Sequence, residues 1–99
     1  GGAAAMNSKA KGNRQEHRAM AYWEARGYRC SRSAASLGVF DCICIGRKGQ
    51  GVLLVQVKSN RWPRSAEMQI LREFEVDSCC CKLIMRYRDR VKEPDIVEI

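Results

Sequence analysis

The feature that most constrains this fold is a pair of apolar runs separated by a glycine-rich turn. Residues 39–45 (VFDCICI) and 52–57 (VLLVQV) are rich in apolar and β-branched side chains, which is typical of buried strands. Residues 46–51 (GRKGQG) between them combine glycine with charge, as hairpin turns do. The sequence therefore predicts two adjacent, antiparallel strands at the centre of a sheet, with Gln56 as the polar interruption of the second.

A helix is predicted before this hairpin. Glu16, Met20 and Trp23 recur at i, i+4 and i+7 within residues 13–26, and Gly27 provides a stop. This spacing indicates an amphipathic helix that packs one face against the sheet.

The remaining elements follow from turn residues and apolar periodicity. Ser65, after Pro63, is predicted to cap a second helix with Glu67 in its first turn. Short strands are expected at residues 28–32, 80–87 and 96–99, with a loop over residues 33–38. The order helix, three strands, helix, strand, strand predicts an α/β fold with a central mixed β-sheet flanked by helices.

The length of 99 residues predicts one domain. Residues 1–5 precede Met6 and are interpreted as a remnant of recombinant expression, which leaves a single domain at residues 6–99. No apolar run reaches the length of a membrane span, and no signal-peptide pattern follows the basic N-terminal stretch. We therefore expect a soluble, intracellular protein, cytoplasmic or phage-encoded in a host cytoplasm.

The charge balance predicts a polyanionic partner. Lysine and arginine number 18 against 11 acidic residues, so the formal net charge is +7, and nucleic acid is the first expectation. The six cysteines include an alternating pair, Cys42 and Cys44, and three consecutive residues at 79–81, which is poor geometry for disulfides. We interpret them as reduced, mostly structural thiols.

Asp41, Gln56 and Lys58 form the candidate catalytic group. Gln56 and Lys58 are two residues apart, so they share a sheet face, and the hairpin brings Asp41 beside Gln56. Glu16 on the first helix could close over them, which would gather oxygen ligands suited to Mg²⁺. Such a metal could activate water for phosphodiester hydrolysis, with Lys58 holding the water or the phosphate.

Each of these residues also has a purely structural interpretation. Glu16 lies three residues after Asn13 and fits a capping-box variant. Asp41 could end a strand in a turn, and Lys58 could be a solvated strand terminus. The combination favours function, because a polar residue inside an apolar strand faces the same way as a lysine and pairs with an aspartate.

At this point a family resemblance becomes specific. Lys11-Gly12, Glu16, Gly27-Tyr28, residues 32–36, Asp41 and residues 55–58 resemble, in order and near spacing, the archaeal-type Holliday-junction resolvases of the PD-(D/E)XK nuclease superfamily. The resemblance covers about half the chain, from Lys11 to Ser59. It implies a restriction-endonuclease-like αβββαβ core and a homodimeric, structure-selective DNA endonuclease that resolves four-way junctions in recombination and repair.

The same resemblance assigns roles to individual residues. It implies Mg²⁺, with Mn²⁺ as a possible substitute. The implied catalytic residues are Glu16, Ser36, Asp41, Gln56 and Lys58, and the implied metal ligands are Glu16, Asp41, Gln56 and Val57. Arg32 matches an arginine expected to contact a phosphate.

Two positions depart from the family pattern. Gln56 stands where the family has an acid, and an amide is a weaker ligand for a hard cation than a carboxylate, so this form could be weakened or inactive. Gln56 is either a natural variant or an inactivating change, and Glu67 on the following helix could replace the missing acid. His17 stands where those resolvases often carry an arginine.

Two alternative functions stay open. Ser65, Glu67 and Gln69 are similar to the S-x-E-x-Q segment of VRR-type nucleases or nickases, which act on other branched or duplex DNA, although an ordinary helix start explains them too. The other alternative is a catalytically silent DNA-binding module, in which Gln56 has replaced the acid of a metal site that was lost.

Basic residues around the candidate site are predicted to bind DNA phosphates. They are Lys11, Arg14, Arg18, Arg32, Arg61 and Arg64, with Lys9 as a further candidate. Trp62 could stack on a base, but packing is the favoured interpretation. Arg86, Arg88 and Arg90 are interpreted as a solvated strand end.

Overall fold

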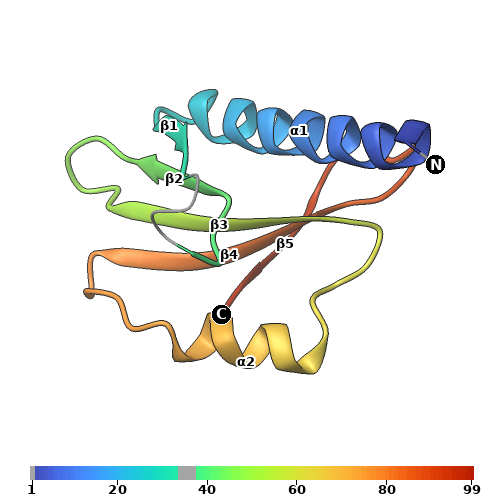
Figure 1. Cartoon of the computed structure of the whole chain (residues 1–99). Helices are drawn as coiled ribbons and strands as arrows, with labels where there is room; N and C mark the ends of the chain where they lie inside the picture. Colours follow the sequence, from blue (N-terminus) through green and yellow to red (C-terminus); the bar gives the residue numbers. More distant parts are fainter. Residues whose placement is uncertain (1, 34–37) are drawn as a thin grey trace.

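The computed structural model describes residues 2–33 and 38–99 and confirms the α/β class (Figure 1). A five-stranded sheet in the order β1-β2-β3-β4-β5 lies between two helices. The strands β3 and β4 are parallel, and the other neighbouring pairs are antiparallel, so the sheet is mixed as predicted. The elements are α1 (Gly2–Glu24), β1 (Arg29–Arg32), β2 (Cys42–Ile45), β3 (Val52–Ser59), α2 (Ser65–Glu73), β4 (Cys80–Tyr87) and β5 (Asp95–Glu98).

The hairpin of β2 and β3 is confirmed, but β2 is shorter than the predicted run of residues 39–45. Its ladder pairs Ile45 with Val52 and Cys42 with Val55. Residues 39–41 lie outside the regular ladder, although the Asp41 N–H still donates to the Val55 oxygen. Phe40, which is 1% exposed, packs in the apolar cluster beneath α2. Asp41 therefore lies just before the strand and not at its centre.

The helix α1 is longer than the predicted helix over residues 13–26. It includes residues 2–5, which sequence reasoning had set aside, and it ends at Glu24. Residues 3–5 are alanines, which have the highest helix propensity, so they extend the helix at little cost. Gly27 then adopts φ +96, a left-handed conformation that favours glycine after a helix.

The start of α2 differs from the prediction, because Ser65 does not cap it. The capping position is Arg64, whose side chain makes no capping hydrogen bond, and Ser65 is the first helical residue. The other end is held by Lys82 of β4. Its Nζ donates to the main-chain oxygens of Leu71, Arg72 and Phe74 at 2.7, 2.7 and 2.9 Å, which satisfies carbonyls left free at the helix terminus.

Apolar side chains form a core layer on each face of the sheet. Cys42, Cys44, Val55 and Met85 are buried with Ala19 of α1 on one face. The second layer gathers beneath α2 and contains Phe40, Leu54, Leu71 and Ile84. The sheet is thus covered on both faces, as its near-continuous apolar strands require.

The last two strands and the cysteines complete the fold. The bounds of β4 are those predicted, and β5 begins and ends one residue earlier than expected. Cys42 and Cys44 are buried in the core, and burial is the main reason that the pKa of Cys42 rises to about 12. Among the described residues, no helix combines the length and apolarity needed to cross a membrane.

We predict that the layer beneath α2 contributes strongly to stability. Ile84 lies on a central strand and is 0% exposed, so Ile84→Ala should lower the free energy of unfolding by about 2–5 kcal/mol through lost burial and a residual cavity. Ile45→Ala is the matched control, because Ile45 is 52% exposed and its truncation should change stability little. Urea unfolding measures both, and equal effects would contradict this core assignment.

Candidate functional site

The candidate site lies at an open edge of β3. Pairing with β2 ends at Val55, whereas β3 continues to Ser59, so within residues 2–33 and 38–99 no strand pairs with its last residues on that side. Asp41 fills the first part of this gap. Its main-chain N–H donates to the Val55 oxygen at 2.9 Å, and its Oδ2 accepts from the Val57 N–H at 2.8 Å. Asp41 therefore lies directly beside Gln56, as predicted.

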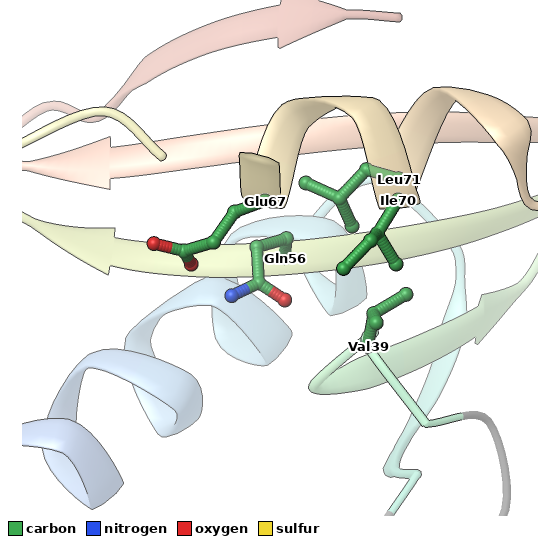
Figure 2. Close-up of a pocket in the computed structure, with 5 residues that line it drawn as sticks. All are labelled: Val39, Gln56, Glu67, Ile70 and Leu71. Carbon is green, nitrogen blue, oxygen red and sulfur yellow. The ribbon is translucent and has the colours of Figure 1, made fainter. Parts of the chain in front are cut away.

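Gln56 and Lys58 project from the face of the sheet that α2 covers. Gln56 lines a pocket of about 150 Å³ with Val39, Glu67 and Leu71 (Figure 2). Lys58 Nζ lies 3.2 Å from Glu67 Oε2. The two β3 side chains thus share a face, as the sequence predicted, and the acid considered as a replacement, Glu67, lies next to both of them.

The amide of Gln56 has an unusual feature. Its Oε1 is buried and has no hydrogen-bond partner among the described residues. A buried oxygen without a partner costs free energy, so such atoms are rare unless a ligand, ion or water satisfies them. Gln56 therefore presents a lone-pair donor at the pocket, which Figure 2 shows it lining together with Val39 and Glu67.

Glu16 approaches Asp41 from the opposite side. It lies on α1, which packs on the other face of the sheet from α2 (Figure 1). Its Oε1 accepts from Arg32, with the Nη2 atom at 2.8 Å and the Nε atom at 2.9 Å. The capping-box interpretation of Glu16 is wrong, because Asn13 lies inside α1 and not at its start.

Electrostatics couple these groups through Asp41. Burial is the largest cause of the raised pKa of Asp41, and the negative charge of Glu16 raises it further. The hydrogen bond from Val57 and the charges of Lys58 and Arg32 lower the same pKa, but burial outweighs them. An ionised Asp41 is therefore poorly solvated, and a cation beside it would relieve that cost.

The residues present fit a magnesium site only in a reduced form. Among residues 11–33 and 38–99, no three His, Cys, Asp or Glu side chains are grouped to hold a metal. The carboxylate of Asp41 and the orphaned amide oxygen of Gln56 are oxygen donors of the kind that Mg²⁺ takes. Glu16 is the other nearby acid, and its carboxylate is held by Arg32.

The other predicted residues fall in several places. Lys11, Arg14 and Arg18 line one cleft with residues 88–90. Arg61 and Arg64 are exposed in the segment before α2, and Ser36 lies outside the described residues. The exposed Arg32 guanidinium pairs with Glu16 and also donates to Asn13 Oδ1 at 2.9 Å, and its contact with a phosphate stays a prediction.

Two interpretations of the C-terminal half are settled by packing. Trp62 packs against the layer beneath α2, with the guanidinium of Arg86 stacked 4.4 Å from its ring centre. Arg86 is not a solvated strand end, because it pairs with Asp95 at 2.7 Å. Sequence reasoning missed Lys82 and the grouping of residues 88–90 with α1, since both depend on contacts between distant segments.

Comparison with protein-family models, curated proteins and solved structures found no match to this chain. The site therefore rests on its own geometry.

We predict that Asp41→Asn stabilises the fold at neutral pH. A raised pKa means that the folded state binds the Asp41 proton more tightly than the unfolded chain does, so stability falls as pH rises through the folded pKa. Asparagine keeps an acceptor for the Val57 N–H and removes the charge. Its advantage in free energy of unfolding should be largest near pH 7 and vanish below the unfolded pKa of about 3.9.

The control is Asp95→Asn, measured by thermal unfolding over the same pH range. The hydrogen bond from Arg86 is the main cause of the lowered pKa of Asp95, so this variant should lose stability at neutral pH and recover as pH falls. If the stability of Asp41→Asn followed the same pH trend as that of Asp95→Asn, burial would not be the dominant influence on the pKa of Asp41.

Proposed function

We propose that this protein is a metal-dependent DNA endonuclease with a PD-(D/E)XK-type core that acts on branched DNA. The observation that carries the proposal is the position of Asp41, whose Oδ2 accepts from the N–H of Val57, the residue between Gln56 and Lys58. The resolvase resemblance implies a strand aspartate set against an acid-x-lysine segment on the hairpin partner. Here Asp41 lies just before β2, and Gln56 stands in place of the acid.

The side chains of the site have distinct tasks in this proposal. Asp41 and Gln56 would hold Mg²⁺, with Glu16 reaching it only by leaving Arg32 or sharing its carboxylate. When bound, Mg²⁺ supplies a water of lowered pKa and a positive charge for the leaving oxygen. Lys58 orients the attacking water or a phosphate oxygen, and the Glu67 carboxylate pairs with the Lys58 ammonium at 3.2 Å.

The substrate class follows from charge and from the resemblance. The net charge of +7 favours a polyanion, and phosphate contacts position such proteins without reading sequence. The four-way junction and the homodimer come from the resemblance, and a two-fold dimer would cut two symmetric strands.

A VRR-type nuclease or nickase is the second candidate. The contact of Glu67 with Lys58 favours it, because the middle residue of the S-x-E-x-Q segment then lies at the site. Gln69 of that segment donates to Glu73 Oε1 at 3.1 Å on the surface of α2. Preference among DNA substrates separates the two candidates. A DNA-binding module without activity would cleave none of the substrates.

We expect Mg²⁺-dependent cleavage that Asp41→Asn abolishes. The assay compares a four-way junction, a flap and a plain duplex, each with Mg²⁺ and with chelator. Asp41→Asn should reduce cleavage to the chelator background while DNA affinity stays within about twofold, because phosphate contacts come from lysine and arginine. Unchanged cleavage by Asp41→Asn would remove Asp41 from the site, and equal cleavage of junction and duplex would contradict the resolvase assignment.

We also expect Gln56→Glu to strengthen the site. The added carboxylate supplies the charge that attracts Mg²⁺, so single-turnover cleavage should accelerate most at low Mg²⁺ concentration. Glu67→Gln is measured in parallel, because it removes the other candidate acid at Lys58. If Gln56→Glu were no faster at any Mg²⁺ concentration and Glu67→Gln were inactive, Glu67 and not the residue at position 56 would supply the acid.

A further inference from the structure

A second site lies where the middle of α1 meets the connection between β4 and β5. Figure 1 shows this connection rising toward the N-terminal half of α1. Between them is a cleft of about 370 Å³, within the usual size of ligand pockets, about 300–1,000 Å³. We call it the basic cleft. It is lined by Lys11, Arg14, Gln15, Arg18, Arg88, Asp89 and Arg90.

The basic cleft concentrates positive charge from distant parts of the sequence. Five of its lining side chains are basic and one is acidic, so its formal charge is +4, more than half of the net charge of the chain. Four of the five are arginines, whose planar guanidinium groups bind phosphate oxygens in pairs. All seven described lining residues are polar or charged, so the chemistry of the cleft suits a polyanion better than an apolar ligand.

Part of the basic cleft is rigidly held. Arg18 donates to Gln15 Oε1 and to the Lys92 main-chain oxygen, both at 2.8 Å, and its guanidinium stacks 4.3 Å from the centre of the Tyr87 ring. An arginine fixed in this way loses little conformational entropy when it binds an anion. The cleft therefore contains a preorganised cation before any ligand arrives.

Other cations of the basic cleft are available for a ligand. Arg14 and Arg90 are exposed and make no ion pair within residues 11–33 and 38–99. Lys11 pairs with Asp89 at 2.8 Å, and that pair is solvent-exposed and therefore weak. Asp89 acts as an internal counterion that a stronger anion can replace.

The basic cleft is joined to the candidate site through the segment after β3. The Asp89 N–H donates to Asn60 Oδ1 at 2.8 Å, and the Asn60 N–H donates to the Tyr87 oxygen at 2.9 Å. Asn60 is two residues beyond Lys58. Lys58 lies on the α2 face and the basic cleft at α1, so a DNA strand bound at Lys58 would pass around the end of β3 and β4 to reach the cleft.

From this arrangement we infer that the basic cleft binds consecutive backbone phosphates of a DNA strand that extends beyond the candidate cleavage site. The inference rests on the proposed function in taking DNA as the ligand, but it does not require cleavage. Arg14, Arg18 and Arg90 make the phosphate contacts, and Asp89 weakens them.

The test measures DNA binding in chelator, across a salt titration, by fluorescence anisotropy. The cleft variant is Arg14→Gln with Arg90→Asn, because neither side chain is paired and asparagine tolerates the φ of 65° at position 90. The matched control is Arg47→Gln with Lys48→Gln in the β2–β3 turn, which removes the same charge at the other end of the sheet (Figure 1). The opposite change is Asp89→Asn.

We expect the cleft variant to lose about tenfold or more in affinity and to flatten the slope of log affinity against log salt by about 2, one for each lost phosphate contact. The control should change the slope by less than half as much. Asp89→Asn should bind DNA more tightly than the unchanged protein, a gain that misfolding cannot produce. Indistinguishable cleft and control variants would overturn the inference.

Competitors separate DNA from other sources of the same charge. Pyrophosphate, inorganic phosphate and polyglutamate are titrated against bound DNA. If polyglutamate displaced DNA as well as unlabelled DNA does, or if the cleft variant lost pyrophosphate binding but kept DNA affinity, the cleft would not be a DNA site. A protein that cleaves normally but fails this test contradicts the basic cleft alone, whereas cleft-dependent binding without cleavage contradicts only the nuclease proposal.

Discussion

The parallel pairing of β3 and β4 is the constraint on which the rest of the structure depends. Parallel neighbours require a crossover connection, and α2 provides it while covering one face of the pair. Leu54 and Ile84 face α2, whereas Val55 and Met85 face the layer beneath α1, so both faces are buried. The two strands can be apolar throughout only because a helix covers each face.

The same pairing puts the candidate chemistry at one edge. Parallel strands end side by side, so Lys58 of β3 lies opposite Arg86 of β4, and the segments that follow them meet at Asn60 and Asp89. The open edge of β3 is filled by a carboxylate and not by a strand. Asp41 therefore replaces a strand hydrogen bond at the cost of a buried charge, and the neighbouring Gln56 keeps an oxygen without a partner. The buried carboxylate of Asp41 and the unpartnered oxygen of Gln56 both cost stability at the edge of β3, and the proposed function uses these same two groups.

The predictability of individual elements follows from the range of the interactions that fix them. The hairpin and β4 were predicted correctly because their apolar pattern and turn residues are local signals. The start of β2 was not, because Phe40 packs beneath α2. The predicted cap was wrong because α2 begins at Ser65 itself after Arg64, and the contact of Lys82 with the last turn of α2 was missed because it comes from another element. Asp41 beside Gln56 could be predicted from hairpin pairing. The contacts of Glu16 with Arg32 and of Lys58 with Glu67 required the packed helices.

By itself, the sequence determined the order of the elements, the antiparallel hairpin, the shared face of Gln56 and Lys58, and the excess of positive charge. These features depend on the alternation of side chains and on composition, which no tertiary contact can change. Only the tertiary structure decided that Glu16 and Lys58 approach Asp41 from opposite faces, and that Arg14 and Arg90 share one cleft. Residues separated by most of the chain become neighbours only when α1 and α2 pack on the two faces of the sheet. This packing is driven by burial of apolar surface between layers, and no single segment of the sequence specifies it.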